Sequence, residues 1–399
     1  MKKLNSKALD YHAFPQPGKL SVSSSKTCDT AEDLSLAYTP GVAEPVLEIV
    51  KDPKNAYRFT NKGNLVAVIT NGTAVLGLGN TGALASKPVM EGKGVLFKRF
   101  ADIDVYDIEI DCKDPDEFIQ TVVNISPTFG GINLEDIAAP ECFYIESELK
   151  KRLSIPVFHD DQHGTAVIVA AGLINALEIQ QKLIEKVKIV FLGAGAAGCS
   201  CARLLKLMGA TDITMVDSKG ILSNDRKNLN QYNQDLAIDT KGKTFNDAIQ
   251  HADVFIGVSG ANLLKNEHVK SMSKKPIIFA LANPDPEMLP SEAHAIRDDI
   301  VMATGRSDFD NQVNNVLGFP FLFKGALEAK AKQINTDMLI AAANALALLA
   351  KEPVPQSVLE AYDVAELNFG PNYIIPKPFD PRLIDWVAKA VKEAYKEDK

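Results

Sequence analysis

A glycine pattern in the middle of the chain most constrains the fold. Gly193, Gly195 and Gly198 form G-x-G-x-x-G directly after the apolar run VKIVFLG, and a helix-length segment follows. Asp217 ends the next apolar run, 19 residues beyond Gly198. A strand, a glycine turn, a helix and an acid at about this distance together favour dinucleotide binding, because the glycines permit a tight turn and a close approach of backbone to pyrophosphate. The free N–H groups at the start of the helix would face the anion.

The same segment indicates which residues would hold the cofactor, but not which dinucleotide it is. Asp217 would bind the ribose hydroxyls and repel a 2′-phosphate, which favours NAD, whereas Lys219 could neutralise that phosphate and admit NADP. Both cofactors therefore stay open. The expected loop residues are Gly193, Ala194, Gly195, Ala196, Ala197 and Gly198.

The surrounding pattern predicts an α/β fold. Between about 180 and 305, near-continuous apolar runs alternate with helix-length segments, which is typical of a parallel sheet covered on both faces. We expect a doubly wound, Rossmann-type NAD(P) domain there, within residues 156–399, followed by a helical tail that packs back onto the body. Residues 1–155 predict a smaller N-terminal α/β domain, and Pro156 lies in the link.

A second G-x-G-x-x-G, at Gly77, Gly79 and Gly82, has a different context. No acid ends a following strand at the required distance, and the segment is hairpin-like rather than βαβ. We interpret it as a structural turn.

Composition excludes several classes of protein. The net charge is −8 and the longest basic run is Lys150-Lys151-Arg152, which argues against a nucleic-acid partner. The longest apolar stretch, 338–350, is shorter than the roughly 20 residues that span a bilayer, so no membrane partner is expected. The five cysteines form no C-x-x-C pair, so we expect a reduced, cytoplasmic protein without disulfides or structural zinc.

Two acidic pairs are candidates for a metal site. Glu135-Asp136 lies in GGINLEDIAAP, and Asp160-Asp161 follows the strand-like run IPVF. Carboxylates at the carboxyl ends of strands converge on a cleft, and such oxygen ligands suit Mg²⁺ or Mn²⁺. A single acidic pair is also typical of a solvated turn. Tyr38 and Lys93, with ordinary pKa values near 10, could transfer protons only where their surroundings shift those values.

Eight ordered motifs give the chain a family resemblance over nearly all of residues 20–385. It resembles the malic enzymes, in particular their short bacterial branch, through YTPGVAEP, NGTAVLGLGN, EGKGVLFKRFADID, GGINLEDIAAPECF, IPVFHDDQHGTA, FLGAGAAG with MVDSKG, ALANPDPE and NQVNNVLGFP. Larger family members carry an arginine where this chain has Asn71-Gly72-Thr73-Ala74. The arginine that would clamp a malate carboxylate is thus missing there, and Arg306 is a conjectured replacement.

The resemblance implies roles for individual residues. It makes Tyr38 the general acid, Lys93 the general base and Asp160 a supporting group in proton transfer. The implied metal ligands are Glu135, Asp136 and Asp161. The residues implied to meet the nicotinamide end of the cofactor and the substrate are Asn283, Asn314 and Asn315.

The resemblance also implies an activity, the oxidative decarboxylation of L-malate to pyruvate and CO₂ by a homodimer, with NAD or NADP and with Mg²⁺ or Mn²⁺. A residue crossing between the subunits is compatible with it. Two alternatives use the same scaffold, a metal-dependent oxaloacetate decarboxylase and a malolactic enzyme that recycles bound NAD. A non-catalytic dinucleotide sensor would not need Tyr38, Lys93 and the acidic residues together.

Overall fold

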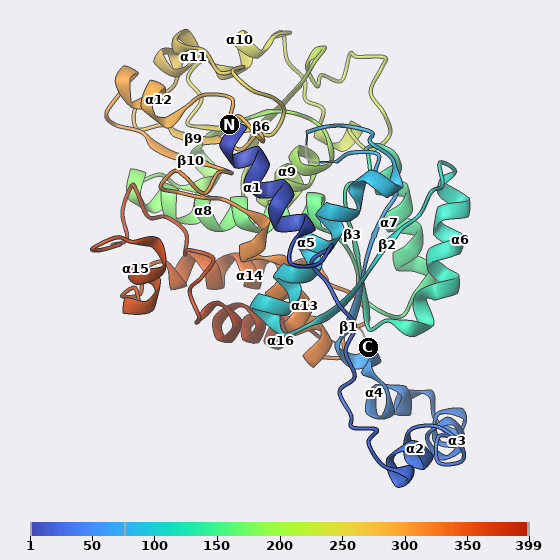
Figure 1. Cartoon of the computed structure of the whole chain (residues 1–399). Coiled ribbons are helices and arrows are strands. Elements are labelled where there is room, and N and C mark those ends of the chain that lie inside the picture. The colour runs from blue at the N-terminus through green and yellow to red at the C-terminus, as the bar shows by residue number, and fades with distance from the viewer. Residues whose placement is uncertain (1, 76, 397–399) are drawn as a thin grey trace.

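The protein contains two parallel sheets, in a computed structural model that describes residues 2–75 and 77–396 (Figure 1). The first sheet has the order β2-β1-β3-β4 and the second the order β10-β9-β8-β5-β6-β7. In the first sheet the strands are β1 (Leu65–Thr70), β2 (Asp104–Glu109), β3 (Gly131–Leu134) and β4 (Val157–His159). In the second they are β5 (Lys188–Leu192), β6 (Asp212–Asp217), β7 (Gly220–Ile221), β8 (Val254–Gly257), β9 (Ile277–Ala280) and β10 (Val301–Thr304). Only β7 pairs antiparallel among the described strands.

Helices cover both faces of the second sheet, which confirms the doubly wound fold. On one face lie α8 (Thr165–Gln180) and α9 (Ala196–Leu207), and on the other lie α10 (Phe245–Ile249), α11 (Asn266–Ser271) and α12 (Pro290–Ile296). Successive residues of β5 alternate between the two cores: Ile189 and Phe191 join one, Val190 and Leu192 the other. Because both faces are buried, the strands are continuously apolar in sequence.

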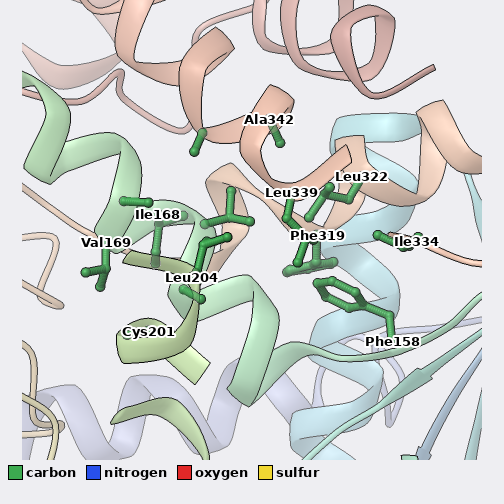
Figure 2. Packing of buried hydrophobic residues seen from close by; sticks show 14 of the residues in the cluster. Phe158, Ile168, Val169, Cys201, Leu204, Phe319, Leu322, Ile334, Leu339 and Ala342 are labelled. Atoms are coloured by element: carbon green, nitrogen blue, oxygen red, sulfur yellow. The ribbon is translucent and has the colours of Figure 1, made fainter. Parts of the chain in front are cut away.

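One core connects the two sheets. It includes residues of β1, β3, β4 and the second sheet, and also of α8, α9 and the C-terminal helices. Figure 2 shows Phe158 of β4 and Phe319 in this core, and the ring of Phe158 lies 5.7 Å from that of Phe323. Ile168 of α8 and Leu204 of α9 lie where these two helices pack together. The C-terminal helices are α13 (Phe319–Glu328), α14 (Thr336–Leu349), α15 (Gln356–Tyr362) and α16 (Lys389–Ala394). Trp386, before α16, packs against this core, so the expected return of the tail is confirmed.

The first sheet differs from expectation in two ways. The helices that belong to the same region as this sheet are α5 (Ala83–Ala101), α6 (Pro115–Ile125) and α7 (Glu141–Arg152). β4 pairs with β3 through Ile132 and Val157, so this sheet extends past the expected boundary after residue 155. The turn at Gly77, Gly79 and Gly82 has φ values of 76°, 79° and 80°, as a structural glycine turn requires. The loop itself is hairpin-like, since Val75 and Gly79 form an antiparallel bridge. The exclusion of a βαβ unit was wrong, however, because β1, α5 and the parallel β2 form one.

Residues 31–59 form an arm that projects from the body. The arm follows α1 (Lys2–Ala13) and consists of α2 (Ala31–Ala37), α3 (Ala43–Lys51) and α4 (Ala56–Phe59), which stand apart from both sheets in Figure 1. None of these last three helices contains a buried residue. Large apolar side chains are exposed on the arm, including Leu36, Val46 and Val50. None of the described helices is long and apolar enough to cross a membrane.

Candidate active site

Two neighbouring strands of the first sheet bring the predicted metal ligands together. β3 ends just before Glu135 and Asp136, and β4 ends just before Asp160 and Asp161, so both acidic pairs emerge at the same sheet edge. Asp136 adopts a left-handed conformation, with φ 53°, which lets two consecutive carboxylates face one point. One carboxylate oxygen from each of Glu135, Asp136 and Asp161 lies within 4.8 Å of the others.

The polar contacts around these carboxylates hold them in place. The side-chain amide of Asn133 donates to Glu135 Oε2 at 3.0 Å, and the backbone N–H of Asp136 donates to Asp161 Oδ2 at 2.8 Å. Glu135 and Asp136 are buried, whereas the Asp161 side chain is 33% exposed. Burial raises the pKa of Glu135 well above its ordinary value, and the neighbouring carboxylates add to this rise although Lys93 opposes it. So much negative charge in a partly open site fits a divalent cation.

Lys93 places its ammonium inside the same cluster. It comes from α5 and forms an ion pair with Asp160 and another with Glu135, the latter at 3.0 Å. The ammonium also lies 4.2 Å from the centre of the Phe319 ring. Burial lowers the pKa of Lys93, but the negative charges of Asp160 and Glu135 outweigh burial and raise it. The predicted base and its predicted supporting group are therefore in direct contact.

Asp160 is positioned by a π-helical turn, Asp160–Gly164, between β4 and α8. Asn315 donates its side-chain N–H to Asp160 Oδ2 at 3.0 Å, whereas the Asn314 side chain accepts the backbone N–H of Val316 and so caps a turn. A Cβ on Gly164 would lie 1.8 Å from Asp160 Oδ1, so only glycine leaves room for this carboxylate. This role of Gly164 was not predicted from the sequence. Its only sequence signal is the position of a glycine four residues after the first acid of HDDQHG.

The dinucleotide loop follows β5, next to β8, where the direction of strand order reverses. Gly193 has φ 119°, and a Cβ there would lie 2.7 Å from the Val258 carbonyl oxygen. A Cβ on Gly198 would lie 2.0 Å from the Gly193 carbonyl oxygen, whereas one on Gly195 would meet nothing within 4 Å. The outer glycines thus serve the turn and the packing of α9, and Gly195 faces open space on the side where the loop would approach a pyrophosphate. Ala196 and Ala197 start α9, whose N-terminus opens onto this space.

The two halves of the site touch. His163, in the π-helical turn, places Nδ1 3.3 Å from the hydroxyl of Ser200 on α9. The carboxylate cluster and the dinucleotide helix therefore belong to one region of the molecule.

The acid at the end of β6 has a partner that the sequence analysis missed. Arg226 donates from Nη1 and Nη2 to the two oxygens of Asp217, at 2.9 and 2.8 Å. The backbone N–H of Lys219 also donates to Asp217, at 2.8 Å, while the Lys219 side chain is exposed. Arg226 lies nine residues beyond Asp217, after the β7 turn, and no spacing rule connects the two residues.

Asn283 and Arg306 follow β9 and β10 at the carboxyl edge of the second sheet. A Cβ on Gly305 would lie 2.9 Å from the Asn283 amide nitrogen, so the two loops touch. The Arg306 guanidinium donates to both oxygens of Asp308, at 2.8 and 2.6 Å, and lies 3.4 Å from Asp285. Its charge is thus already balanced, and a role in clamping substrate stays a prediction.

Tyr38 is a predicted site residue that lies away from the acidic cluster of Glu135, Asp136 and Asp161 in the single chain. It follows α2 in the projecting arm and is 70% exposed. In the described part of the chain it makes no ion pair or hydrogen bond with Lys93 or the acidic cluster.

Comparisons with known proteins identify the family of this chain. Residues 17–150 match the malic enzyme N-terminal domain and residues 162–363 match the malic enzyme NAD binding domain. An NADP-dependent malic enzyme of Halomonas elongata is 59% identical over 97% of this chain and 92% of its own length. An NADP-dependent malic enzyme of Escherichia coli is 56% identical over 98% of this chain, which spans 52% of that longer relative. A malic enzyme crystal structure from Pyrococcus horikoshii superposes with a TM-score of 0.89 at 43% identity, covering 98% of this chain and 90% of that one. The chain therefore belongs to the malic enzyme family.

Proposed function

We propose that the chain catalyses the oxidative decarboxylation of L-malate to pyruvate and CO₂, with NAD or NADP as hydride acceptor and Mg²⁺ or Mn²⁺ as metal. The observation that supports this most directly is the contact between the turn holding Asp160 and helix α9 of the dinucleotide loop. A simple oxaloacetate decarboxylase would not need the open space at Gly195 beside that helix. Malate and a divalent cation would occupy the edge where β3 and β4 end.

In this reaction, Lys93 accepts the proton of the malate C2 hydroxyl while hydride leaves C2, which requires its neutral amine form. A cation held by Glu135, Asp136 and Asp161 would offset the negative charges that raise the pKa of Lys93. Asp160 and Asn315 hold Lys93 in place through the contacts described above. Phe319, packed against the ammonium, keeps water from that side of the lysine. Because Glu135 and Asp136 are buried and Asp161 is partly exposed, substrate would approach the acidic cluster from the side of Asp161.

Glu135, Asp136 and Asp161 would hold the cation. When bound, it supplies Lewis acidity at the C2 oxygen, which stabilises the charge that develops when the C4 carboxylate leaves. The dinucleotide supplies the hydride acceptor. Decarboxylation becomes easy once C2 is a ketone, which explains why one chain would combine both sites.

The test supplies purified protein with L-malate, Mn²⁺ and either NAD or NADP, and follows reduced cofactor and pyruvate together. We expect both products in equal amounts and no reaction without the metal. Pyruvate from oxaloacetate, without reduced cofactor from malate, would favour the decarboxylase instead. Lactate as the product would favour the malolactic enzyme.

We further propose a homodimer in which the arm of each subunit docks on the other and brings Tyr38 to the partner's site. The arm exposes a cluster of apolar side chains and buries none of its own in α2, α3 or α4. Exposed patches of this kind mark association surfaces. The members with the largest exposure are Leu34, Leu36, Tyr38, Val46, Leu47 and Val50. Tyr38 would then protonate C3 of the enol product.

Mixing two inactive variants tests this arrangement. Tyr38→Phe and Lys93→Ala each lack one group, and a mixed dimer would contain one site with both groups intact. After unfolding and joint refolding, about a quarter of wild-type activity should return, because half of the dimers are mixed and half of their sites are complete. No recovered activity, although light scattering shows dimers, would place Tyr38 in the site of its own subunit.

Two further expectations stay proposals. The five cysteines are free and Cys28 is exposed, which supports a reducing, cytoplasmic location. We also propose two functional domains as expected from the sequence, with the boundary moved beyond β4, because that strand belongs to the first sheet.

A further inference from the structure

The acid at the end of β6 is already occupied. Asp217 Oδ1 accepts from Arg226 Nη1 and from the backbone N–H of Lys219, and Oδ2 accepts from Arg226 Nη2. A carboxylate offers about four acceptor positions, so about one is left. The ribose of NAD presents two hydroxyl groups, and this acid cannot receive both as the NAD arrangement requires.

Arg226 is held rigidly in this position. Its Nε donates to Asn228 Oδ1 at 3.1 Å, and its Nη1 also donates to the carbonyl oxygens of Gly220 and Ile221, each at 3.2 Å. The side chain is only 14% exposed. A guanidinium has five N–H donors, and these contacts leave one on Nη2 without an acceptor in the described part of the chain.

The charges around Asp217 favour an additional anion. Arg226 balances the carboxylate, so Asp217 no longer repels a phosphate. Lys219 and Lys227 are exposed on either side of the β7 turn, and neither ammonium takes part in an ion pair among the described residues. A phosphate monoester with a charge near −2 would find a free guanidinium donor and two lysines within this short segment.

We propose that Arg226 determines cofactor specificity by selecting NADP over NAD, with its guanidinium as a ligand of the 2′-phosphate and Lys219 as a second cationic group. This inference rests on the proposed dinucleotide site, and it adds to it a residue and a choice of cofactor. Asp217 acts here as the anchor that orients Arg226, rather than as the acceptor of ribose hydroxyls.

Binding of cofactor fragments tests the inference without any catalysis. Calorimetric titration with adenosine 2′,5′-bisphosphate and with AMP compares two ligands that differ only in the 2′-phosphate. The wild-type protein should bind the bisphosphate about tenfold or more tightly than AMP. Arg226→Gln should abolish this preference while changing the affinity for AMP by less than about threefold. The preference should also decline with added salt, because the contact is ionic.

Two more variants separate the attraction by Arg226 from other effects. Asp217→Asn with Arg226→Gln removes both charges, so no uncovered acid can repel the phosphate, and it should still lack the preference. Arg297→Gln is the matched control: Arg297 pairs with both oxygens of Asp299, donates to two carbonyl oxygens and is 17% exposed, but it lies before β10 at the opposite edge of the sheet. That variant should keep the wild-type preference.

Equal binding of AMP and bisphosphate by the wild-type protein would overturn the inference. So would an unchanged preference in Arg226→Gln, or an equal loss of both affinities, which would indicate that Arg226 only supports the fold of the loop. Failure of malate oxidation with intact fragment preference would instead overturn the proposed reaction and leave this inference standing.

Discussion

Replacing Gly164 by alanine tests whether space beside Asp160 controls the proposed base. Gly164 has φ −61° and ψ −48°, which alanine adopts without strain, so the added methyl group is the whole perturbation. That methyl carbon would lie 1.8 Å from Asp160 Oδ1 and 2.8 Å from Cγ. Asp160 is fully buried and cannot move toward solvent.

The size of the effect follows from these distances. Ordinary contact begins at 3.4 Å, so the carboxylate oxygen and the backbone must separate by about 1.6 Å. A displacement of about 1 Å in a catalytic group can lower the rate roughly a hundredfold. Overpacking of this kind destabilises a fold by about 1–3 kcal/mol. We therefore expect kcat to fall by about a hundredfold or more while the protein still folds.

The assay compares kcat for malate oxidation, the unfolding free energy and the affinity for the dinucleotide. Gly172→Ala is the matched control, because this glycine is buried in α8, the helix that directly follows Gly164, and a Cβ there would lie 3.3 Å from the edge of Phe279. The control should retain kcat. Dinucleotide affinity should stay unchanged in both variants, because the open space at Gly195 is not altered.

A double-mutant cycle provides the decisive comparison. Asp160→Ala removes the carboxylate with which the new methyl group would collide. If Gly164 acts through Asp160, adding Gly164→Ala to Asp160→Ala costs no further activity. Losses that multiply in the double variant, or a Gly164→Ala enzyme with wild-type kcat, would refute the reasoning.

Three further perturbations test other groups. Lys93→Ala should abolish malate oxidation, retain dinucleotide binding, and destabilise the fold by about 3–5 kcal/mol because it leaves buried Asp160 and Glu135 uncompensated; unchanged turnover would exclude Lys93 as the base. Asp161→Ala should weaken Mn²⁺ binding, followed by electron paramagnetic resonance, by at least about 10–100-fold, and wild-type affinity would exclude it as a ligand. Burial and the nearby Asp107 raise the pKa of Glu109 to about 7 from an ordinary 4.5. The folded chain therefore keeps a proton that the unfolded chain releases, so the free energy of unfolding should fall as pH rises from about 4.5 to 7. Glu109→Gln should flatten that fall in denaturant titrations, and an equally steep fall in the variant would contradict this assignment.

Much of the second sheet could be predicted because local sequence determines it. Strands such as β5 and β6 are buried on both faces and continuously apolar, and the glycine turn after β5 has a spacing set by the geometry of the turn itself. The position of Asp160-Asp161 was also predictable, because this pair directly follows the strand-like run IPVF, whereas Glu135-Asp136 was recognised only as an acidic pair. β3 was not predicted, because a strand of four residues carries too short an apolar pattern.

The rest of the site depends on contacts between distant residues. The pairs of Arg226 with Asp217 and of Asn315 with Asp160 form only after the chain has folded, and no periodicity indicates them. The need for glycine at 164 likewise comes from a side chain across a turn. The position of Tyr38 relative to the acidic cluster could not be predicted either. In the single chain its side chain is exposed on the arm, and no local pattern indicates what it contacts.

Substitutions at the three glycines of the dinucleotide loop would have two different consequences for the protein. Any side chain at Gly193 or Gly198 would collide with backbone, so random substitutions there would be removed by quality control as misfolded protein. An alanine at Gly195 would have no neighbouring atom within 4 Å in the described part of the chain, so it would leave a folded, abundant protein whose cofactor space is narrowed. A survey that scores variants only by expression level would classify position 195 as tolerant. Variants at this position that fold but no longer bind the cofactor would therefore go unnoticed in such a survey, and a binding screen would be needed to detect them.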